Sequence, residues 1–146
     1  MLPGRLPVVD REALRRQLVT DEGLELSAYQ DSLGYWTIGV GRLIDARKGG
    51  RITVAEAMML LDHDIARVEA EVRARWPWFE ALDAARQDVM LNMAFNLGVA
   101  GLAGFKTTLG HIEAGRYAEA ADAMLRSRWA SQVHDRADRL AAVMRG

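Results

Sequence analysis

The sequence predicts a predominantly helical α+β fold with two lobes, in which a small antiparallel sheet interrupts an otherwise helical chain. Apolar residues follow helical spacing on either side of residues 24–44 but not within them. A capping box at residues 53–56 opens one long helix, and residues 83–97 are apolar on nearly every face. With 146 residues, half of them apolar, the chain is long enough for the core of a single domain.

The first helix is expected at residues 11–22. Asp10 is a favourable N-cap, and Gly23 follows as a left-handed stop. Leu14 and Leu18 give the segment a short apolar stripe. The preceding residues 1–8 are expected to form a loose arm.

The sheet lobe is expected at about residues 23–52. Tyrosine, tryptophan, threonine, isoleucine and valine cluster there between glycines, a composition typical of short strands. The first two strands are expected to turn at residues 32–34, and a third strand is expected near Arg51 and Ile52.

A linking helix is expected at about residues 53–75. Thr53 and Glu56 form the capping box, and apolar residues follow at helical spacing as far as Trp76. A helix of about 22 residues measures roughly 33 Å at a rise of 1.5 Å per residue. Because one compact lobe does not need that length, the helix is expected to span both lobes.

The helical lobe is expected at about residues 76–146, together with the N-terminal helix 10–22. Residues 83–97 should be fully buried at the centre of a bundle, because they are apolar nearly all round. Further short helices are predicted at residues 107–114, 117–126 and 135–145, with residues 127–129 in a connection.

Composition and charge exclude several classes of function. The formal net charge is −1, and the 17 arginines and 2 lysines are interleaved with acids. The sequence therefore has no basic stripe, and nucleic-acid binding is not expected. The sequence has no run of about 18 apolar residues, so no membrane-spanning helix is expected. Residues 1–10 lack the apolar core of a secretory signal.

No cofactor or metal is expected. The absence of cysteine excludes disulfides and thiolate metal sites. His63 lies between Asp62 and Asp64, but consecutive helical side chains point about 100° apart and cannot converge on one ion. The sequence also has no Gly-X-Ser-X-Gly motif, phosphate loop or dinucleotide fingerprint.

Two carboxylates are candidates for acid–base chemistry. Glu22 stands where the first helix should end, and the negative end of the helix dipole helps it to keep the proton that a general acid donates. A solvated glutamate at a helix end is the commoner situation. Asp31 is either a base or charge stabiliser across a cleft from Glu22, or an ordinary turn aspartate that bonds its own backbone.

Thr37 is the third candidate. Its hydroxyl either positions a water in the cleft or belongs to an ordinary strand threonine. Two carboxylates and a hydroxyl suit glycoside hydrolysis, in which one acid protonates the leaving oxygen and the other activates water. The spacing alone leaves these alternatives open.

Residues 20–42 read TDEGLELSAYQDSLGYWTIGVGR. This segment resembles the catalytic segment of the phage-type lysozymes, whose pattern runs Glu-Gly, Tyr-X-Asp and Gly-Tyr-X-Thr-Ile-Gly-X-Gly. Further blocks match at residues 92–98, 101–105 and 127–129, and the resemblance covers roughly residues 12–142. It implies a lysozyme-like two-lobed fold and a muramidase that hydrolyses the β-1,4 bond between N-acetylmuramic acid and N-acetylglucosamine with inversion.

The resemblance also implies catalytic roles. Glu22 would be the general acid, Asp31 the second carboxylate and Thr37 the residue that helps to position the attacking water. An inverting pair of carboxyls needs room for that water, roughly 6.5–9.5 Å. Arg136 matches a family arginine that pairs with the catalytic glutamate, a pairing that would favour the ionised acid.

Substrate contacts and departures from the family follow from the same match. Phe95, Asn96 and Thr108 match positions that line the cleft from the helical lobe. Arg42 stands where the family usually has histidine, so a pH-sensitive ion pair made by that histidine is lost. The linker at residues 45–51 is short, and a net charge of −1 gives little steering toward anionic cell walls.

The implied partner is the glycan strand of peptidoglycan, cut by a monomer during cell lysis by a phage or prophage. Without a signal peptide, the protein is expected to be made in the host cytoplasm and to act on the periplasmic or extracellular wall after release. A holin or another export partner would serve that step, and no stable membrane insertion is expected. A lytic transglycosylase and a non-catalytic wall-binding or membrane-disrupting homologue stay open as alternatives.

Overall fold

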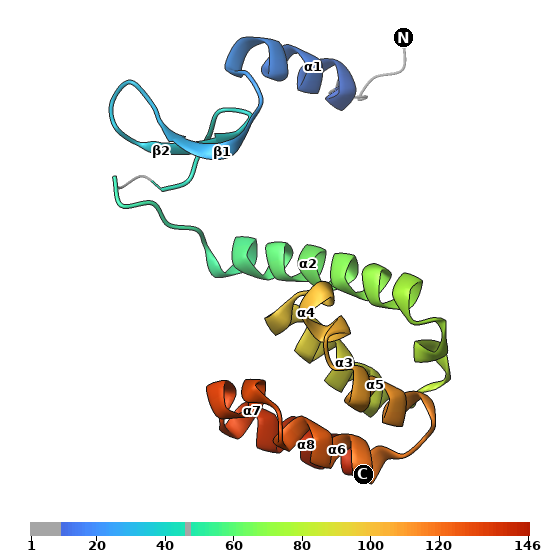
Figure 1. The fold of residues 1–146 in the computed structure, drawn as a ribbon. Coiled ribbons are helices and arrows are strands. Elements are labelled where there is room, and N and C mark those ends of the chain that lie inside the picture. Colours follow the sequence, from blue (N-terminus) through green and yellow to red (C-terminus); the bar gives the residue numbers. More distant parts are fainter. Residues whose placement is uncertain (1–9, 46–47) are drawn as a thin grey trace, which may run out of the picture. The chain divides into compact units, whose positions relative to one another are not determined.

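The computed structural model describes residues 10–45 and 48–146 (Figure 1). The chain divides into two compact units, the first ending at Ala57 and the second covering Met58–Gly146. Helices predominate in the described residues and one small antiparallel sheet accompanies them, which confirms the predicted α+β class. The arm expected at residues 1–8 lies outside the described residues.

The first helix, α1 (Arg11–Glu22), has the predicted bounds. The Asp10 carboxylate caps it by accepting a hydrogen bond of 3.1 Å from the Ala13 N–H. Gly23 ends it with a φ of 79°, and its N–H donates to the Val19 carbonyl. A positive φ is readily adopted by glycine and rarely by other residues, which is why the helix stops there.

The sheet has the order β1 (Glu25–Gln30), β2 (Trp36–Gly39) and β3 (Arg42–Leu43), with both pairs antiparallel. The Gly34 N–H donates to the Asp31 carbonyl at 3.0 Å, which confirms the turn predicted at residues 32–34.

The third strand is not where the sequence predicted it. Arg51 and Ile52 lie outside any strand, whereas Arg42 pairs directly back onto Ile38. Gly39 and Gly41 have φ values of 69° and 60°, so they turn the chain sharply and start the third strand at once.

The long helix is α2 (Val54–Arg75), 22 residues in length. Its capping box is confirmed: the Glu56 N–H donates to the Thr53 hydroxyl at 3.1 Å, and the Glu56 carboxylate accepts from the Thr53 N–H at 3.0 Å. The division between the two units falls inside this helix, after Ala57. The predicted lobe boundaries stay predictions.

The second unit continues with a short 3-10 helix, η1 (Pro77–Ala81), and six α-helices. These are α3 (Ala84–Leu97), α4 (Val99–Ala103), α5 (Lys106–Glu113), α6 (Tyr117–Leu125), α7 (Arg128–Val133) and α8 (Asp135–Arg145). Helix α6 packs against α5 and α8, and α3 packs against α4 and α8.

Two expectations about this unit are wrong. Arg128 and Trp129 do not lie in a connection, because the Ser127 hydroxyl accepts the Ala130 N–H and caps α7, in which Trp129 is buried. Helix α3 is not buried all round: Met90 and Met93 are buried, whereas Phe95 is 46% exposed. Polar residues at positions 88, 92 and 96 keep one face of α3 outside the core.

Among the residues that the structure describes, the buried apolar core belongs entirely to the second unit. Its largest fully buried side chains are Phe79, Met90, Met93, Leu102, Ile112, Met124, Met144, Val72 and Val89. In the described part of the first unit, Thr37 is the one buried residue.

Candidate active site

Glu22 is the last residue of α1 and is exposed. Among the described residues of its own unit, its carboxylate has neither a hydrogen-bond donor nor an ion-pair partner. Gly41, in the turn between β2 and β3, lies directly against it: a Cβ built on Gly41 would stand 2.8 Å from Glu22 Cδ. The carboxyl group is therefore bounded by backbone and open to solvent, as a proton donor to a sugar oxygen must be.

Asp31 follows β1, and one of its two carboxylate oxygens is occupied by the turn. Oδ1 accepts hydrogen bonds of 2.9 Å from the N–H groups of Leu33 and Tyr35. Asp31 is thus the turn aspartate that one interpretation expected. The same bonds hold its carboxylate in one orientation, and Oδ2 accepts no hydrogen bond within the described residues, so it is available to bind water.

Thr37 lies on the central strand β2 with only 5% of its surface exposed. Its hydroxyl donates to the Tyr35 carbonyl at 3.2 Å. The same carbonyl accepts the Asp31 N–H at 2.8 Å. Tyr35 therefore joins Asp31 and Thr37, and the structure brings these two candidates together on one hairpin.

Arg42, the departure from the family pattern, forms an ion pair with Glu56. The other oxygen of Glu56 caps α2 through the Thr53 N–H. Because an arginine side chain keeps its charge at all physiological pH values, this link between β3 and the start of α2 does not titrate as a histidine pair would. The sequence showed the substitution but not its partner.

The other predicted site residues belong to the second unit. The Arg136 side chain donates from Nε to the Asn92 side-chain oxygen at 2.9 Å and from Nη2 to the Asn92 carbonyl at 3.3 Å. Its pairing with Glu22 stays a prediction. Phe95 and Arg136 line one pocket of about 400 Å³, together with Leu61, Ile65, Val68, Asp88, Leu91 and Asn92.

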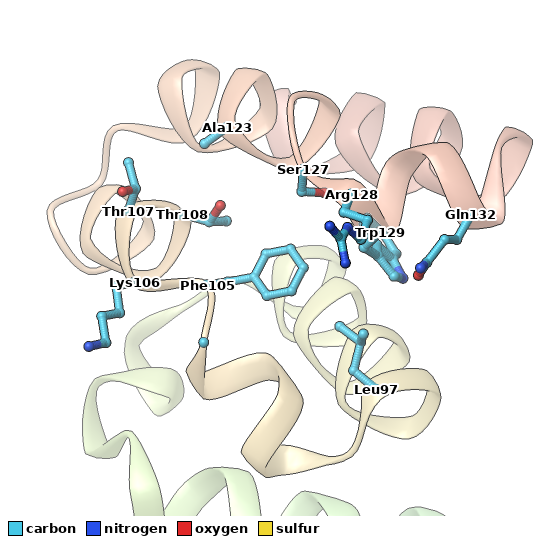
Figure 2. Close-up of a pocket in the computed structure, with 11 residues that line it drawn as sticks. Leu97, Phe105, Lys106, Thr107, Thr108, Ala123, Ser127, Arg128, Trp129 and Gln132 are labelled. Atoms are coloured by element: carbon cyan, nitrogen blue, oxygen red, sulfur yellow. The ribbon is translucent and has the colours of Figure 1, made fainter.

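Thr108 lines a second pocket of the same unit, of about 390 Å³ (Figure 2). Phe105 and Trp129 form its aromatic wall, with their rings edge to face and their centroids 6.1 Å apart. Asn96 fixes that wall, because its side-chain oxygen accepts the Trp129 indole N–H at 2.8 Å. The substrate-binding roles of Phe95, Asn96 and Thr108 stay predictions.

Sequence reasoning did not single out Phe105, Trp129 or Asn92 as site residues. Phe105 and Trp129 stand in the matched blocks 101–105 and 127–129, which was the available signal. Asn92 begins the block 92–98, but its bond to Arg136 joins positions 44 residues apart. Spacing along the chain does not reveal such a contact.

Two further observations concern the described residues, 10–45 and 48–146. They contain no group of three histidine, aspartate or glutamate side chains arranged to hold a metal ion. None of their helices combines the length and the apolar composition needed to cross a membrane.

A helix-rich α+β fold, with a glutamate at a helix end and an aspartate and threonine on an adjacent hairpin, is characteristic of the lysozyme class. The chain belongs to the phage lysozyme family, whose model matches residues 19–143. That match includes Glu22, Asp31 and Thr37 and confirms the resemblance seen in the sequence.

Three relatives illustrate the range of the family. The chain is 33% identical to the pre-baseplate central spike protein Gp5 of Enterobacteria phage T4, over 91% of this chain but 27% of Gp5. It is 28% identical to probable T4-type lysozyme 1 of Dictyostelium discoideum, over 90% of this chain and 93% of that protein. It is 34% identical to the endolysin of Salmonella phage P22, over 75% and 76% of the two chains. The chain thus spans about a quarter of the phage T4 protein and most of the Dictyostelium one.

Proposed function

We propose that this protein is a muramidase that hydrolyses the β-1,4 bond between N-acetylmuramic acid and N-acetylglucosamine in peptidoglycan, with inversion at the anomeric carbon. The observation that carries this proposal is the family match over residues 19–143, which includes all three catalytic candidates. The hydrogen bonds that join Asp31 and Thr37 through Tyr35 support it further.

In this mechanism Glu22 donates its proton to the glycosidic oxygen as the bond from that oxygen to the anomeric carbon breaks. A water attacks the carbon from the opposite face and gives a proton to Asp31 Oδ2, the oxygen that the turn leaves available. The Thr37 hydroxyl, which donates to Tyr35, keeps lone pairs that accept a hydrogen bond from that water. Solvent then returns a proton to Glu22 and removes one from Asp31.

Reducing-sugar release from purified peptidoglycan tests the assignment. Glu22→Gln and Asp31→Asn should each lower kcat by about 10²-fold or more, because general acid–base catalysis contributes about that much. Glu25→Gln removes another exposed carboxylate of the same unit and should keep kcat within about twofold. Equal release by wild type and Glu22→Gln would contradict the role of the acid.

Mass spectrometry of the products separates the alternatives. A hydrolase leaves reducing N-acetylmuramic acid ends, whereas a transglycosylase leaves anhydro ends. Lysis of cells by Glu22→Gln at the wild-type rate would instead favour the hypothesis of a non-catalytic wall-binding or membrane-disrupting protein.

We further propose that a monomer of this protein acts in cell lysis by a phage or prophage, reaching the wall from the cytoplasm through a holin or another export partner. The endolysin name of the P22 relative supports a role in lysis. Lysis of an expressing culture should then require a co-expressed holin. Lysis by this protein alone at the same rate would contradict the need for that partner.

A further inference from the structure

Two glycines at the β2–β3 turn have the same backbone requirement: Gly39 ends β2, and Gly41 lies in the turn itself. Gly39 has a φ of 69° and Gly41 a φ of 60°, values that residues with a side chain rarely adopt. The turn alone therefore explains why glycine stands at both positions.

The two glycines differ in what a side chain would meet. A Cβ built on Gly39 has no atom within 4 Å. A Cβ built on Gly41 would lie 2.8 Å from Glu22 Cδ and 3.0 Å from Glu22 Cβ, and closer still to Oε2. These distances are shorter than carbon and oxygen atoms tolerate without bonding, so Gly41 alone leaves the space that the Glu22 side chain occupies.

This steric boundary matters because, within the described residues of the first unit, no donor holds the Glu22 carboxylate. Asp31, by contrast, is oriented by two N–H groups. The backbone at Gly41 is itself fixed, since Arg42 pairs with Ile38 in the sheet and with Glu56 through its side chain.

We propose that Gly41 is a positioning residue for Glu22: its missing side chain admits the carboxyl group, and its backbone is the wall that holds that group in place. This inference rests on the proposed function, because it gives a role to the position of the acid. A methyl group at residue 41 would push aside the end of a flexible glutamate side chain, so it would displace the acid without unfolding the unit. A displacement of about 1 Å can lower a rate by about 10²-fold.

The test compares Gly41→Ala with Gly39→Ala, which share the left-handed backbone and differ in the contact with Glu22. The thermal unfolding midpoint should be lowered by a similar number of degrees in both variants. On purified peptidoglycan, Gly41→Ala should lose at least tenfold in kcat with KM within about twofold, and Gly39→Ala should keep both within about twofold. The alkaline limb of the pH–rate profile, which reports the group that must keep its proton, should move only in Gly41→Ala.

A second readout does not depend on activity. The Glu22 carboxyl ¹³C resonance, assigned by its absence from the spectrum of Glu22→Gln, should move in Gly41→Ala and stay in place in Gly39→Ala. Equal kcat for the two glycine variants would overturn the proposal, whether or not the resonance moves, because the contact would then not position the acid. Equal sugar release by wild type and Glu22→Gln would instead refute the muramidase function itself.

If alanine lowers the unfolding midpoint too far for assay, asparagine replaces it at both positions. Asparagine tolerates left-handed backbone better than alanine does, and it still brings a Cβ to residue 41. The same contrast in kcat and in the Glu22 resonance is expected between Gly41→Asn and Gly39→Asn.

Discussion

The two units of this protein are stabilised in different ways. The second unit buries a continuous set of methionine, aromatic and aliphatic side chains from α2 to α8. The described part of the first unit buries Thr37 alone, and none of the residues of α1 is buried. The first unit relies on local hydrogen bonds instead: the Asp10 cap, the Asp31 turn and the capping box at Thr53.

This difference teaches where each kind of substitution should act. Burial of apolar surface is the main source of folding free energy, so losses of stability should concentrate in the second unit. All three proposed catalytic residues lie in the first unit, where geometry depends on turns and caps. Substitutions there should change activity more readily than they unfold the protein.

The largest expected effect is the loss of Phe79, which is fully buried. Phe79→Ala should lower the free energy of unfolding by about 3–5 kcal/mol, because it removes apolar contacts and leaves a cavity. Leu26→Ala, on β1 and 86% exposed, should change it by less than about 0.5 kcal/mol. Urea unfolding measures both, and similar losses would mean that the first unit buries an apolar surface comparable to the core.

A smaller effect is expected at the capping box. Thr53→Ala removes the hydroxyl that accepts the Glu56 N–H and should cost about 1 kcal/mol of unfolding free energy. Thr53→Ser keeps that hydroxyl and should stay within a few tenths of a kcal/mol of wild type. The same urea experiment checks this pair. If Thr53→Ala lowered the free energy of unfolding by less than the experimental error, the first unit would not depend on its caps.

The smallest effect concerns the pH dependence of the second unit. The Arg145 side chain donates a hydrogen bond to Asp122 and holds the pKa of that carboxyl below its usual value. A lowered folded-state pKa adds stability above the unfolded-state pKa of about 3.9, and that stability is lost as pH falls through the folded-state pKa. The unfolding midpoint of wild type should therefore fall more between pH 5 and pH 2 than that of Asp122→Asn.

Asp138→Asn is the matched control for this experiment, because Asp138 is an exposed carboxylate of α8 without a side-chain ion pair among the described residues. The unfolding midpoint of Asp138→Asn should fall as much as that of wild type over the same pH range. If the unfolding midpoint of Asp122→Asn fell as much as that of wild type, a role for the Asp122–Arg145 pair in stability would be contradicted.

Local signals in the sequence predicted much of the fold. The Asp10 cap, the Gly23 stop and the capping box each depend on residues within four positions of one another, so they fix the bounds of α1 and the start of α2. The Asp31 turn was predictable for the same reason. The catalytic candidates needed the family pattern, because their spacing alone did not distinguish a turn aspartate from a base.

The remaining features depend on contacts between distant positions or on backbone geometry. The third strand was misplaced because the positive φ values of Gly39 and Gly41 turn the chain so sharply that the strand begins at Arg42, well before Arg51. Helix α7 was missed because its six residues are too few for a periodic pattern. The approach of Gly41 to Glu22 joins two elements that the sequence had placed separately.

Glu56 carries a consequence for engineering. From the sequence alone, Glu56 is an ordinary glutamate at the start of a helix. Such glutamates are common targets when surface carboxylates are replaced to raise the net charge. Here one oxygen caps α2 and the other pairs with Arg42 at the end of the turn that faces Glu22. Redesign of this protein toward a more cationic surface should therefore spare Glu56 and begin with carboxylates such as Glu113, which lies far along the chain from that turn.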